Sequence, residues 1–456
     1  MSLASTAPGL LTQTIGYKRA ADVFGEVGTV DAYLAVEAAL AEVEGDLGVI
    51  PPEAVAPIVA ACRRDAIDMD ELRTAAAIVG YPIVPLVSML ANRAGESGQW
   101  VHFGTTTQDV MDTAQVLQLR EALTATLVDT ARIELLLGRL CDLHRRTPMV
   151  GRSKLQHGVP ISFGYKIAVW LDQVFRTRTG LARALDEASV LQFGGAVGTL
   201  ASLRNHGMGV RRRLAWRLSL SEPDISWHAS RDRMVALAGS VAALLGALAK
   251  IAVDVAHLMS TEVGELREPA AAGRGSSSTM PQKRNPVICE AIIEAARGIQ
   301  HVPGILLGAM LQEHERGIGH GYSERAALSD SVLQLSGAVS LTEELLAGLE
   351  VDTSRMAQNL NLTNGLVYTE AMMIHLSDRI GRIEAHRVLH NVSHRVIQTG
   401  ADLETALQEE TGMALPSQVL DFDLQVEAAQ EMIEQVLDTV SFRPQGDAVK
   451  LQETGA

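Results

Sequence analysis

Proline placement is the feature that most restricts the fold of this chain. Prolines are dense in the first third, but none occurs between Pro160 and Pro223, between Pro223 and Pro269, or between Pro303 and Pro416. A proline inside a helix removes a hydrogen bond and clashes with the preceding turn, so these three intervals are where long helices can run. We therefore expect long helices to dominate the structure of this 456-residue chain.

Side-chain periodicity and composition predict the same fold class. Apolar residues recur at spacings of three, four and seven along residues 328–349, as an amphipathic helix requires. Aromatic residues make up only 4% of the chain, and this composition disfavours sheets. The prediction is an all-α fold with a helical N-terminal region (1–140), a central long-helix bundle (141–352) and a smaller helical C-terminal region (353–456). A frayed polar tail is expected from residue 443 onward.

Charge and hydropathy exclude two classes of protein. The chain has 39 Lys+Arg and 54 Asp+Glu, a formal net charge of −15. Nucleic-acid binders need a basic face, so no nucleic-acid partner is expected, although an anionic substrate needs only a local basic pocket. The most apolar run, residues 235–249, falls short of the roughly 20 residues of a membrane span. We expect it to be a buried core helix, and we expect no membrane partner.

Cysteine usage predicts the compartment. Cys62, Cys141 and Cys289 cannot all pair with one another, and none belongs to a C-x-x-C pattern. A disulfide framework and a cysteine zinc site are therefore disfavoured, and residues 1–20 lack the pattern of a signal peptide. These features predict a cytoplasmic protein. Dinucleotide-binding, phosphate-loop, zinc-protease and nucleophile-elbow motifs are also missing from the sequence.

The segment 273–286 carries the strongest functional signal. Its three consecutive serines, two glycines and two prolines cannot form a good helix, although helical runs flank it. Such a loop can close over an anion with backbone N–H groups and cations; a flexible surface connection is the alternative. From Ser277 to Pro286 the segment resembles, without a gap, the S-S-x-M-P-x-K-x-N-P signature of the fumarase/aspartase superfamily.

Two further segments extend the resemblance. Residues 102–114 resemble the H-F-G-x-T-S-x-D-V-x-D-T-A segment of the adenylosuccinate lyase and carboxymuconate cycloisomerase branch. Residues 151–164 resemble the pattern G-R-T-H-x-Q-x-x-x-P-x-T-F-G, with Ser153 in place of threonine and Lys154 in place of histidine. The resemblance implies three helical regions around a long central bundle. It also implies a homotetramer in which different subunits complete each site.

The chemistry shared by this superfamily is anti β-elimination, which removes a proton next to a carboxylate. The site must supply a base and stabilise the charge that then builds up on that carboxylate. By resemblance the base is Ser277, and the Thr106 and Thr107 hydroxyls hold carboxylates, with a helix N-cap as the alternative role. The resemblance implies catalytic roles for Ser277, His102, Lys154 and Glu290, and substrate binding by Thr106, Thr107, Ser153, Gln156, Lys283, Asn285 and Arg325.

Lys154 changes the expected proton chemistry. In the superfamily a carboxylate matching Glu290 pairs with the histidine of the third segment, so Glu290 would here face an ammonium group. An imidazole with a pKa near 6.5 exchanges protons at neutral pH, whereas a lysine with a pKa near 10.4 stays charged. We expect either that His102 acts as the acid, or that the leaving group departs as a stable anion beside a cation.

The run 315–325 bears on the substrate. It resembles the adenylosuccinate lyase run E-R-D-I-S-H-S-S-x-E-R, but Gly321 and Tyr322 replace the paired serines that help bind a nucleotide phosphate. This replacement disfavours a succinyl nucleotide. Arg325 matches the resemblance and is expected to hold a carboxylate, with a solvated helix charge as the alternative.

These observations predict a lyase without metal or organic cofactor that acts on a small anionic dicarboxylate. The first expectation is cleavage of a C–N bond in a substituted succinate to release fumarate, with a small substrate such as nitrosuccinate preferred over adenylosuccinate. A 3-carboxy-cis,cis-muconate cycloisomerase is the first alternative, supported by residues 191–195 and by Gly264 and Glu265. A non-catalytic structural relative, like the lens crystallins of this superfamily, is the second.

Overall fold

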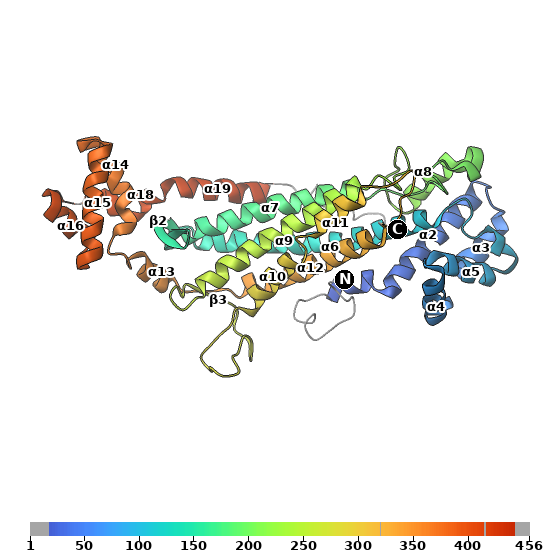
Figure 1. Cartoon of the computed structure of the whole chain (residues 1–456), viewed down its shortest axis with the longest axis horizontal. Helices are drawn as coiled ribbons and strands as arrows, with labels where there is room; N and C mark the ends of the chain where they lie inside the picture. The colour runs from blue at the N-terminus through green and yellow to red at the C-terminus, as the bar shows by residue number, and fades with distance from the viewer. Residues whose placement is uncertain (1–17, 320, 415, 443–456) are drawn as a thin grey trace. The chain divides into compact units, whose positions relative to one another are not determined.

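The computed structural model describes residues 18–319, 321–414 and 416–442 (Figure 1). The described residues group into two compact units: those within Met1–Asp129, Thr177–Gly246 and Glu294–Leu341 form unit 1, and those within Thr130–Arg176, Ala247–Ile293 and Thr342–Ala456 form unit 2. In the described chain, five helices contribute residues to both units: α6 (Thr107–Leu143), α7 (Phe163–Ala188), α9 (Asp232–Leu258), α10 (Val287–Gly298) and α12 (Gly321–Ala347).

The predicted all-α fold is confirmed, and its physical basis is visible in the long helices. Helices α7, α9 and α12 lie within the three proline-free intervals. The apolar face of α12 is buried, with Leu328, Val332 and Leu335 fully shielded from solvent. Helix α9 has 27 residues, more than the predicted apolar run, and its length and composition would allow it to cross a membrane. Half of its most apolar window is buried within the protein, as in a core helix.

Unit 1 contains a set of shorter helices around one apolar core. Helix α4 begins at an N-cap, Asp68, whose carboxylate accepts the backbone N–H groups of Asp70 and Glu71 at 3.0 Å. The core includes Leu34, Ile58, Leu86 and Leu90. The shorter elements of this unit are α1 (Lys18–Phe24), α2 (Glu26–Asp46), α3 (Pro52–Ala61), α4 (Met69–Val79), α5 (Ile83–Arg93), α8 (Gly207–Arg217), α11 (Val302–Ala309) and the 3-10 helices η2 (Arg64–Ala66), η3 (Gly95–Trp100) and η4 (Ala201–His206).

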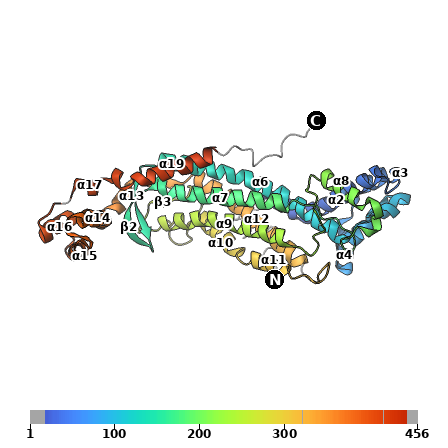
Figure 2. The same ribbon diagram turned by 90° about the horizontal axis from the view of Figure 1, so that it is seen from above.

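Unit 2 ends in a group of C-terminal helices. Helices α14, α15 and α16 lie together in Figure 2 and share an apolar core that includes Leu376, Val392 and Leu407. The elements are α13 (Thr353–Leu360), η5 (Leu366–Tyr368), α14 (Thr369–Ile380), α15 (Arg382–Thr399), α16 (Leu403–Thr411), α17 (Ser417–Leu420), α18 (Phe422–Gln425) and α19 (Glu427–Phe442). The tail predicted from residue 443 onward lies outside the described residues, as does most of the N-terminal segment 1–20.

The structure adds a β-hairpin that the sequence analysis did not predict. Strand β1 (Pro148–Ser153) pairs antiparallel with β2 (Gln156–Ser162), and a second short pair joins β3 (Leu266–Arg267) to β4 (Glu350–Val351). Pro148 and Pro160 disfavour a helix there. Met149 and Val150 of strand β1 are buried and hold the hairpin in place. The hairpin holds most of the 151–164 segment. The division into three helical regions stays a prediction.

Candidate active site

In unit 1, the buried Asp109 organises the 102–114 segment. Its carboxylate accepts the backbone N–H groups of Thr106 at 3.1 Å, Gly194 at 2.9 Å and Gly195 at 2.8 Å, and it lies 2.7 Å from His228 Nε2. Gly194 must be glycine, because a Cβ atom there would overlap the Ser226 side chain. Asp109 thus connects the threonine run at the start of α6 to the 191–195 segment.

His102 contacts a carboxylate from helix α2. Its Nδ1 atom lies 2.6 Å from Oε1 of Glu37, whose side chain is almost fully buried. Burial lowers the pKa of His102, but the charge and hydrogen bond of Glu37, together with the charge of Asp109, outweigh it and raise that pKa above its ordinary value. The structure therefore favours an imidazolium at this predicted catalytic position.

Thr106 has a cationic neighbour that the sequence analysis missed. The exposed guanidinium of Arg316 donates to Thr106 Oγ1 at 3.0 Å, to Gln108 Oε1 at 3.1 Å and to the Ala196 carbonyl at 3.3 Å. A cation beside a hydroxyl is a suitable arrangement for a carboxylate. Arg316 lies in the 315–325 run, and its match to the family motif there could have identified it as a site residue. Thr107 is the first residue of α6.

Arg325 is held by a buried charge network within unit 1. Its guanidinium donates to Asp112, which also accepts Arg231 at 2.9 and 3.3 Å, and Arg231 in turn binds Glu324. Burial raises the pKa of Asp112, but the charges of Arg231 and Arg325 outweigh it and hold that pKa below its ordinary value. Arg325 is therefore not a solvated helix charge. Its contact with a substrate carboxylate stays a prediction.

The residue that replaces a family serine, Tyr322, has a local structural role. Its hydroxyl donates to the Gly80 carbonyl, and its ring stacks on Tyr81 with centroids 6.2 Å apart. The side chain thereby fastens the start of α12 to the turn between α4 and α5.

In unit 2, Lys154 lies at the tip of the β1–β2 hairpin. Ser153 pairs with Gln156, and the two turn residues Lys154 and Leu155 have φ angles of +51° and +65°. Two positive φ angles define a type I′ turn, which glycine or asparagine usually occupies. The backbone is therefore strained at the position where the sequence departs from the family pattern, and such strain is typical of functional sites.

A buried ion pair fixes the base of this hairpin. The guanidinium of Arg152 binds both carboxylate oxygens of Glu265, which is fully buried and also accepts Asn359 Nδ2 at 2.8 Å. Glu265 directly precedes β3, and the next carboxylate along, Glu268, accepts the backbone N–H groups of Ile288 at 3.2 Å and Cys289 at 2.7 Å. This short segment therefore connects the hairpin to the start of α10.

The segment 273–286 forms a long loop between α9 and α10, as predicted (Figure 1). Its neck is closed by a hydrogen bond from Asn285 N to Gly275 O at 2.8 Å, an approach that a Cβ atom at Gly275 would block. Inside the loop, Ser277 Oγ accepts the backbone N–H groups of Thr279 at 3.3 Å and Met280 at 3.1 Å. Two N–H donors at one hydroxyl oxygen favour its ionised form. Lys283 is exposed.

The predicted residues fall into two groups. Unit 1 carries His102, Thr106, Thr107 and Arg325, and unit 2 carries Ser153, Lys154, Gln156, Ser277, Lys283, Asn285 and Glu290. Glu290 is exposed in the first turn of α10. Within the described part of the chain, Lys154 and Glu290 form neither a hydrogen bond nor an ion pair, so their pairing stays a prediction.

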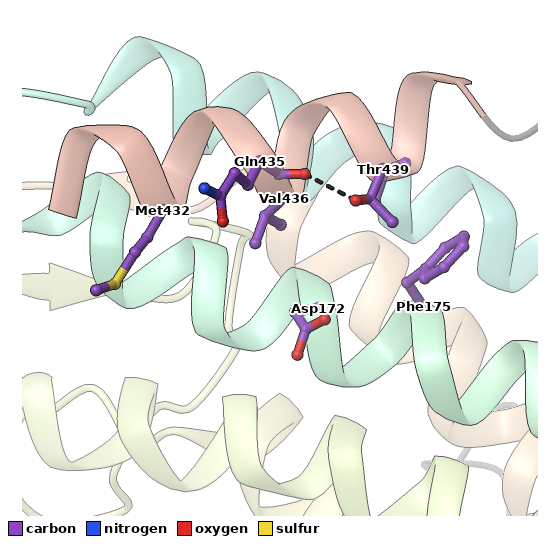
Figure 3. A pocket seen from close by; sticks show the side chains of 7 residues that line it. Asp172, Phe175, Met432, Gln435, Val436 and Thr439 are labelled. Atoms are coloured by element: carbon purple, nitrogen blue, oxygen red, sulfur yellow. Dashed lines mark hydrogen bonds between the residues drawn. The ribbon is translucent and has the colours of Figure 1, made fainter. Parts of the chain in front are cut away.

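Two cavities lie in unit 2. The first, of about 430 Å³, lies beside the hairpin and is lined by Arg152, Ser153, Lys166, Trp170, Lys250 and Asp254 among others. The second, of about 350 Å³, lies between α7 and α19 and is lined by both apolar and polar side chains (Figure 3). Its carboxylate, Asp172, pairs with Arg176 at 2.8 Å. The second cavity contains no predicted site residue.

Among the described residues, no cluster of three or more His, Cys, Asp or Glu side chains could hold a metal ion.

Comparison with known proteins identifies the family of the chain. A family model described as "Lyase" matches residues 15–301, more than half of the chain. The 3-carboxy-cis,cis-muconate cycloisomerase of Pseudomonas aeruginosa is 42% identical over 392 residues, 85% of each protein. Trans-aconitate decarboxylase 1 of Mycosarcoma maydis is 38% identical over 85% of this chain and 78% of that protein. The crystal structure of the 3-carboxy-cis,cis-muconate lactonizing enzyme from Pseudomonas putida covers 95% of this chain and 99% of its own, with a TM-score of 0.88 and 37% identity.

Three observations now agree: the signature loop, the all-α fold, and the match of both sequence and structure over most of the chain. The chain belongs to the fumarase/aspartase superfamily of lyases, in the branch that includes the 3-carboxy-cis,cis-muconate cycloisomerases.

Proposed function

We propose that this protein interconverts 3-carboxy-cis,cis-muconate and its lactone, as a cycloisomerase. The first expectation, cleavage of a C–N bond to release fumarate, is wrong. Three relatives at 40–42% identity and two matched crystal structures carry the cycloisomerase or lactonizing-enzyme name instead. The stated alternative therefore becomes the main hypothesis.

The proposed reaction is β-elimination run in reverse within one molecule. A carboxylate oxygen adds to the alkene carbon β to a second carboxylate, which forms a C–O bond, and the alkene electron pair takes up a proton at the α carbon. In the opposite direction a base removes that α proton, and the ring carboxylate leaves as an anion. Both directions pass through a species with extra negative charge on the second carboxylate, which the site must stabilise.

The single observation that carries the proposal is Lys154 at the strained tip of the hairpin. A carboxylate leaving group is already a stable anion, so it needs a cation beside it and no proton. An ammonium group supplies that charge at neutral pH, whereas a histidine at this position is suited to protonating an amine. Lys154 therefore fits ring closure and ring opening better than it fits the release of ammonia or an amine.

The signature loop supplies the groups for the α proton and the stabilised carboxylate. We assign proton transfer at the α carbon to Ser277, since two backbone N–H groups already point at its Oγ. Lys283 and Asn285 hold the carboxylate that accumulates charge, and Thr106, Thr107 and Arg316 hold another. The substrate class is a small polycarboxylate anion. The protein acts as a homotetramer in the cytoplasm, and different subunits contribute the residues of units 1 and 2.

The test is a direct assay on the purified full-length chain. Cyclisation destroys the conjugated diene of 3-carboxy-cis,cis-muconate, so we expect ultraviolet absorbance to fall with enzyme-dependent kinetics and a lactone to form without loss of carbon dioxide. Trans-aconitate serves as the comparison substrate, with carbon dioxide release as its readout. Faster turnover of trans-aconitate than of carboxymuconate would contradict the proposal.

A further inference from the structure

Two buried carboxyl groups lie behind His102 on helix α2. Glu37 and Glu44 are seven residues apart, two helical turns, so they share one face of the helix. Glu37 is 2% exposed and Glu44 is fully buried. Buried carboxyl groups are costly unless they are paired or neutral, so each of them requires an explanation.

Glu37 directs its charge to a single partner. Its Oε1 atom lies 2.6 Å from His102 Nδ1, and Oε2 has no hydrogen-bond partner among the described residues. A carboxylate can only accept, so Nδ1 of His102 is the donor. The other ring nitrogen, Nε2, makes no hydrogen bond within the described part of the chain, and the side chain keeps 18% of its surface exposed.

Two other titratable groups near Glu37, Glu44 and Cys62, are neutral, so they add no further negative charge beside it. Neither oxygen of Glu44 has a partner in the described chain, and burial, reinforced by the charge of Glu37, raises the pKa of Glu44 to about 9. Cys62, which directly follows α3, is affected in the same way, and its pKa rises to about 12. At neutral pH both groups are protonated. The anions that act on His102 are therefore Glu37 from α2 and Asp109 from α6.

The backbone of His102 is also constrained. Its φ angle is +59°, in the left-handed region that non-glycine residues rarely adopt. The neighbouring Phe103 packs on Trp100 with ring centroids 5.4 Å apart. A strained backbone that persists must be held by its surroundings, and the Glu37 hydrogen bond is the polar contact that holds this side chain.

We propose that Glu37 is a positioning residue for His102: its carboxylate fixes the ring with Nδ1–H toward α2 and keeps it cationic, so that Nε2–H is free to donate to a substrate carboxylate. The substrate part of this inference rests on the proposed cycloisomerase function, whereas the state of His102 does not.

Protonation decides whether this contact is favourable. With Nδ1–H held by Glu37, an imidazolium presents Nε2–H, a charge-assisted donor to an anion. A neutral ring in the same orientation would present the Nε2 lone pair, which repels a carboxylate. Glu37 therefore extends substrate binding to higher pH than an unpaired histidine, with its ordinary pKa near 6.5, would allow.

The charge state can be measured without turnover. Hydrogen–deuterium exchange at histidine Cε1, followed by mass spectrometry, reports the pKa of single histidines. Trypsin would release residues 94–120, which contain His102 and no other histidine. We expect the pKa of His102 to lie above 6.5 in the wild type and to fall by about one unit or more in Glu37→Gln, because an opposite charge is lost. Glu37→Asp should restore part of the shift. Glu53→Gln, on the exposed surface of α3, is the matched control and should change nothing.

Kinetics test the consequence for the substrate. We expect Glu37→Gln to raise the KM for carboxymuconate more than it lowers kcat. The alkaline limb of the pH profile of kcat/KM should also shift to lower pH, by as much as the pKa of His102 falls. A wild-type His102 with a pKa at or below 6.5, or a folded Glu37→Gln enzyme with an unchanged His102 pKa, would overturn the inference. If the wild type fails to cyclise carboxymuconate, the proposed function fails, while the exchange experiment still decides the role of Glu37. If Glu37→Gln does not fold, the wild-type measurement and Glu37→Asp decide it.

Discussion

The guanidinium of Arg152 donates two hydrogen bonds to the carboxylate of Glu265, at 2.6 and 3.0 Å, although 113 positions separate the two residues. Arg152 precedes the hairpin tip by two residues, and Glu265 leads into β3 and then into the signature loop. This ion pair therefore joins two segments that the proposed mechanism requires, and its carboxylate is fully buried.

Glu265→Gln should destabilise the protein strongly. The substitution leaves the guanidinium of Arg152 largely buried without a counter-charge, a change that typically costs about 3–5 kcal/mol. We expect a fall of several degrees in the melting temperature. Glu350→Gln is the matched control, since the exposed Glu350–Arg284 pair should contribute less than about 1 kcal/mol. Equal melting temperatures for the two variants would show that the buried ion pair contributes no more to stability than the exposed one.

Ser277→Ala should abolish most of the turnover of carboxymuconate. Loss of the group that transfers the α proton typically reduces the rate by about 10²–10⁴-fold. The measurement is kcat by loss of diene absorbance. Ser276→Ala makes the same chemical change one residue before the signature and removes a local hydrogen bond to the Gly273 carbonyl, so it should keep most of the activity. Comparable rates for Ser277→Ala and the wild type would assign the proton transfer to another residue.

Lys154→Gln should slow both ring closure and ring opening. The amide keeps the length of the side chain approximately but removes the charge beside the ring carboxylate, and we expect kcat to fall by about 10²-fold, the usual effect of losing one electrostatic stabiliser. Lys154→Arg keeps the charge and should retain part of the activity. Leu155→Gln tests the turn itself, because Leu155 has the same strained backbone and is 79% exposed. A larger loss in Leu155→Gln than in Lys154→Gln would point to turn geometry and away from charge.

Glu44→Gln should make stability less sensitive to pH. The pKa of Glu44 is about 9 in the folded protein, raised from 4.5, so its contribution to stability is fully present below pH 4.5 and is lost as the pH rises toward 9. At pH 7 the wild type has lost about 3 kcal/mol, at 1.36 kcal/mol per pKa unit. The glutamine variant avoids this loss, so its advantage in melting temperature should be larger at pH 8 than at pH 5. Glu53→Gln is again the control, and an equal difference at both pH values would argue that Glu44 is ionised.

Much of this molecule could be predicted because the signals are local. Proline-free intervals and the apolar face of residues 328–349 lie within single elements, and helices α7, α9 and α12 follow them. The absence of a helix in residues 273–286 likewise depends on the intrinsic preferences of serine, glycine and proline. These preferences act over a few residues, so they can be read from the order of the amino acids.

Other features required the folded chain. The hairpin escaped prediction because its strands are short, and each is stabilised mainly by pairing with the other. Arg316 gained significance only when its guanidinium was found on Thr106 Oγ1, 210 residues earlier in the chain. The shared motif also could not distinguish a fumarate-releasing lyase from a cycloisomerase, since both reactions use the same signature loop.

By itself, the sequence determined the fold class, the signature loop and the membership of a lyase superfamily, because helix preference and motif spacing are properties of neighbouring residues. Tertiary structure decided which charges meet: Arg152 with Glu265, Arg325 with Asp112, and His102 with Glu37. Burial and electrostatic pairing depend on distances between residues far apart in the chain. The charge of His102 therefore follows from the folded arrangement around it, and its amino-acid type alone does not decide it.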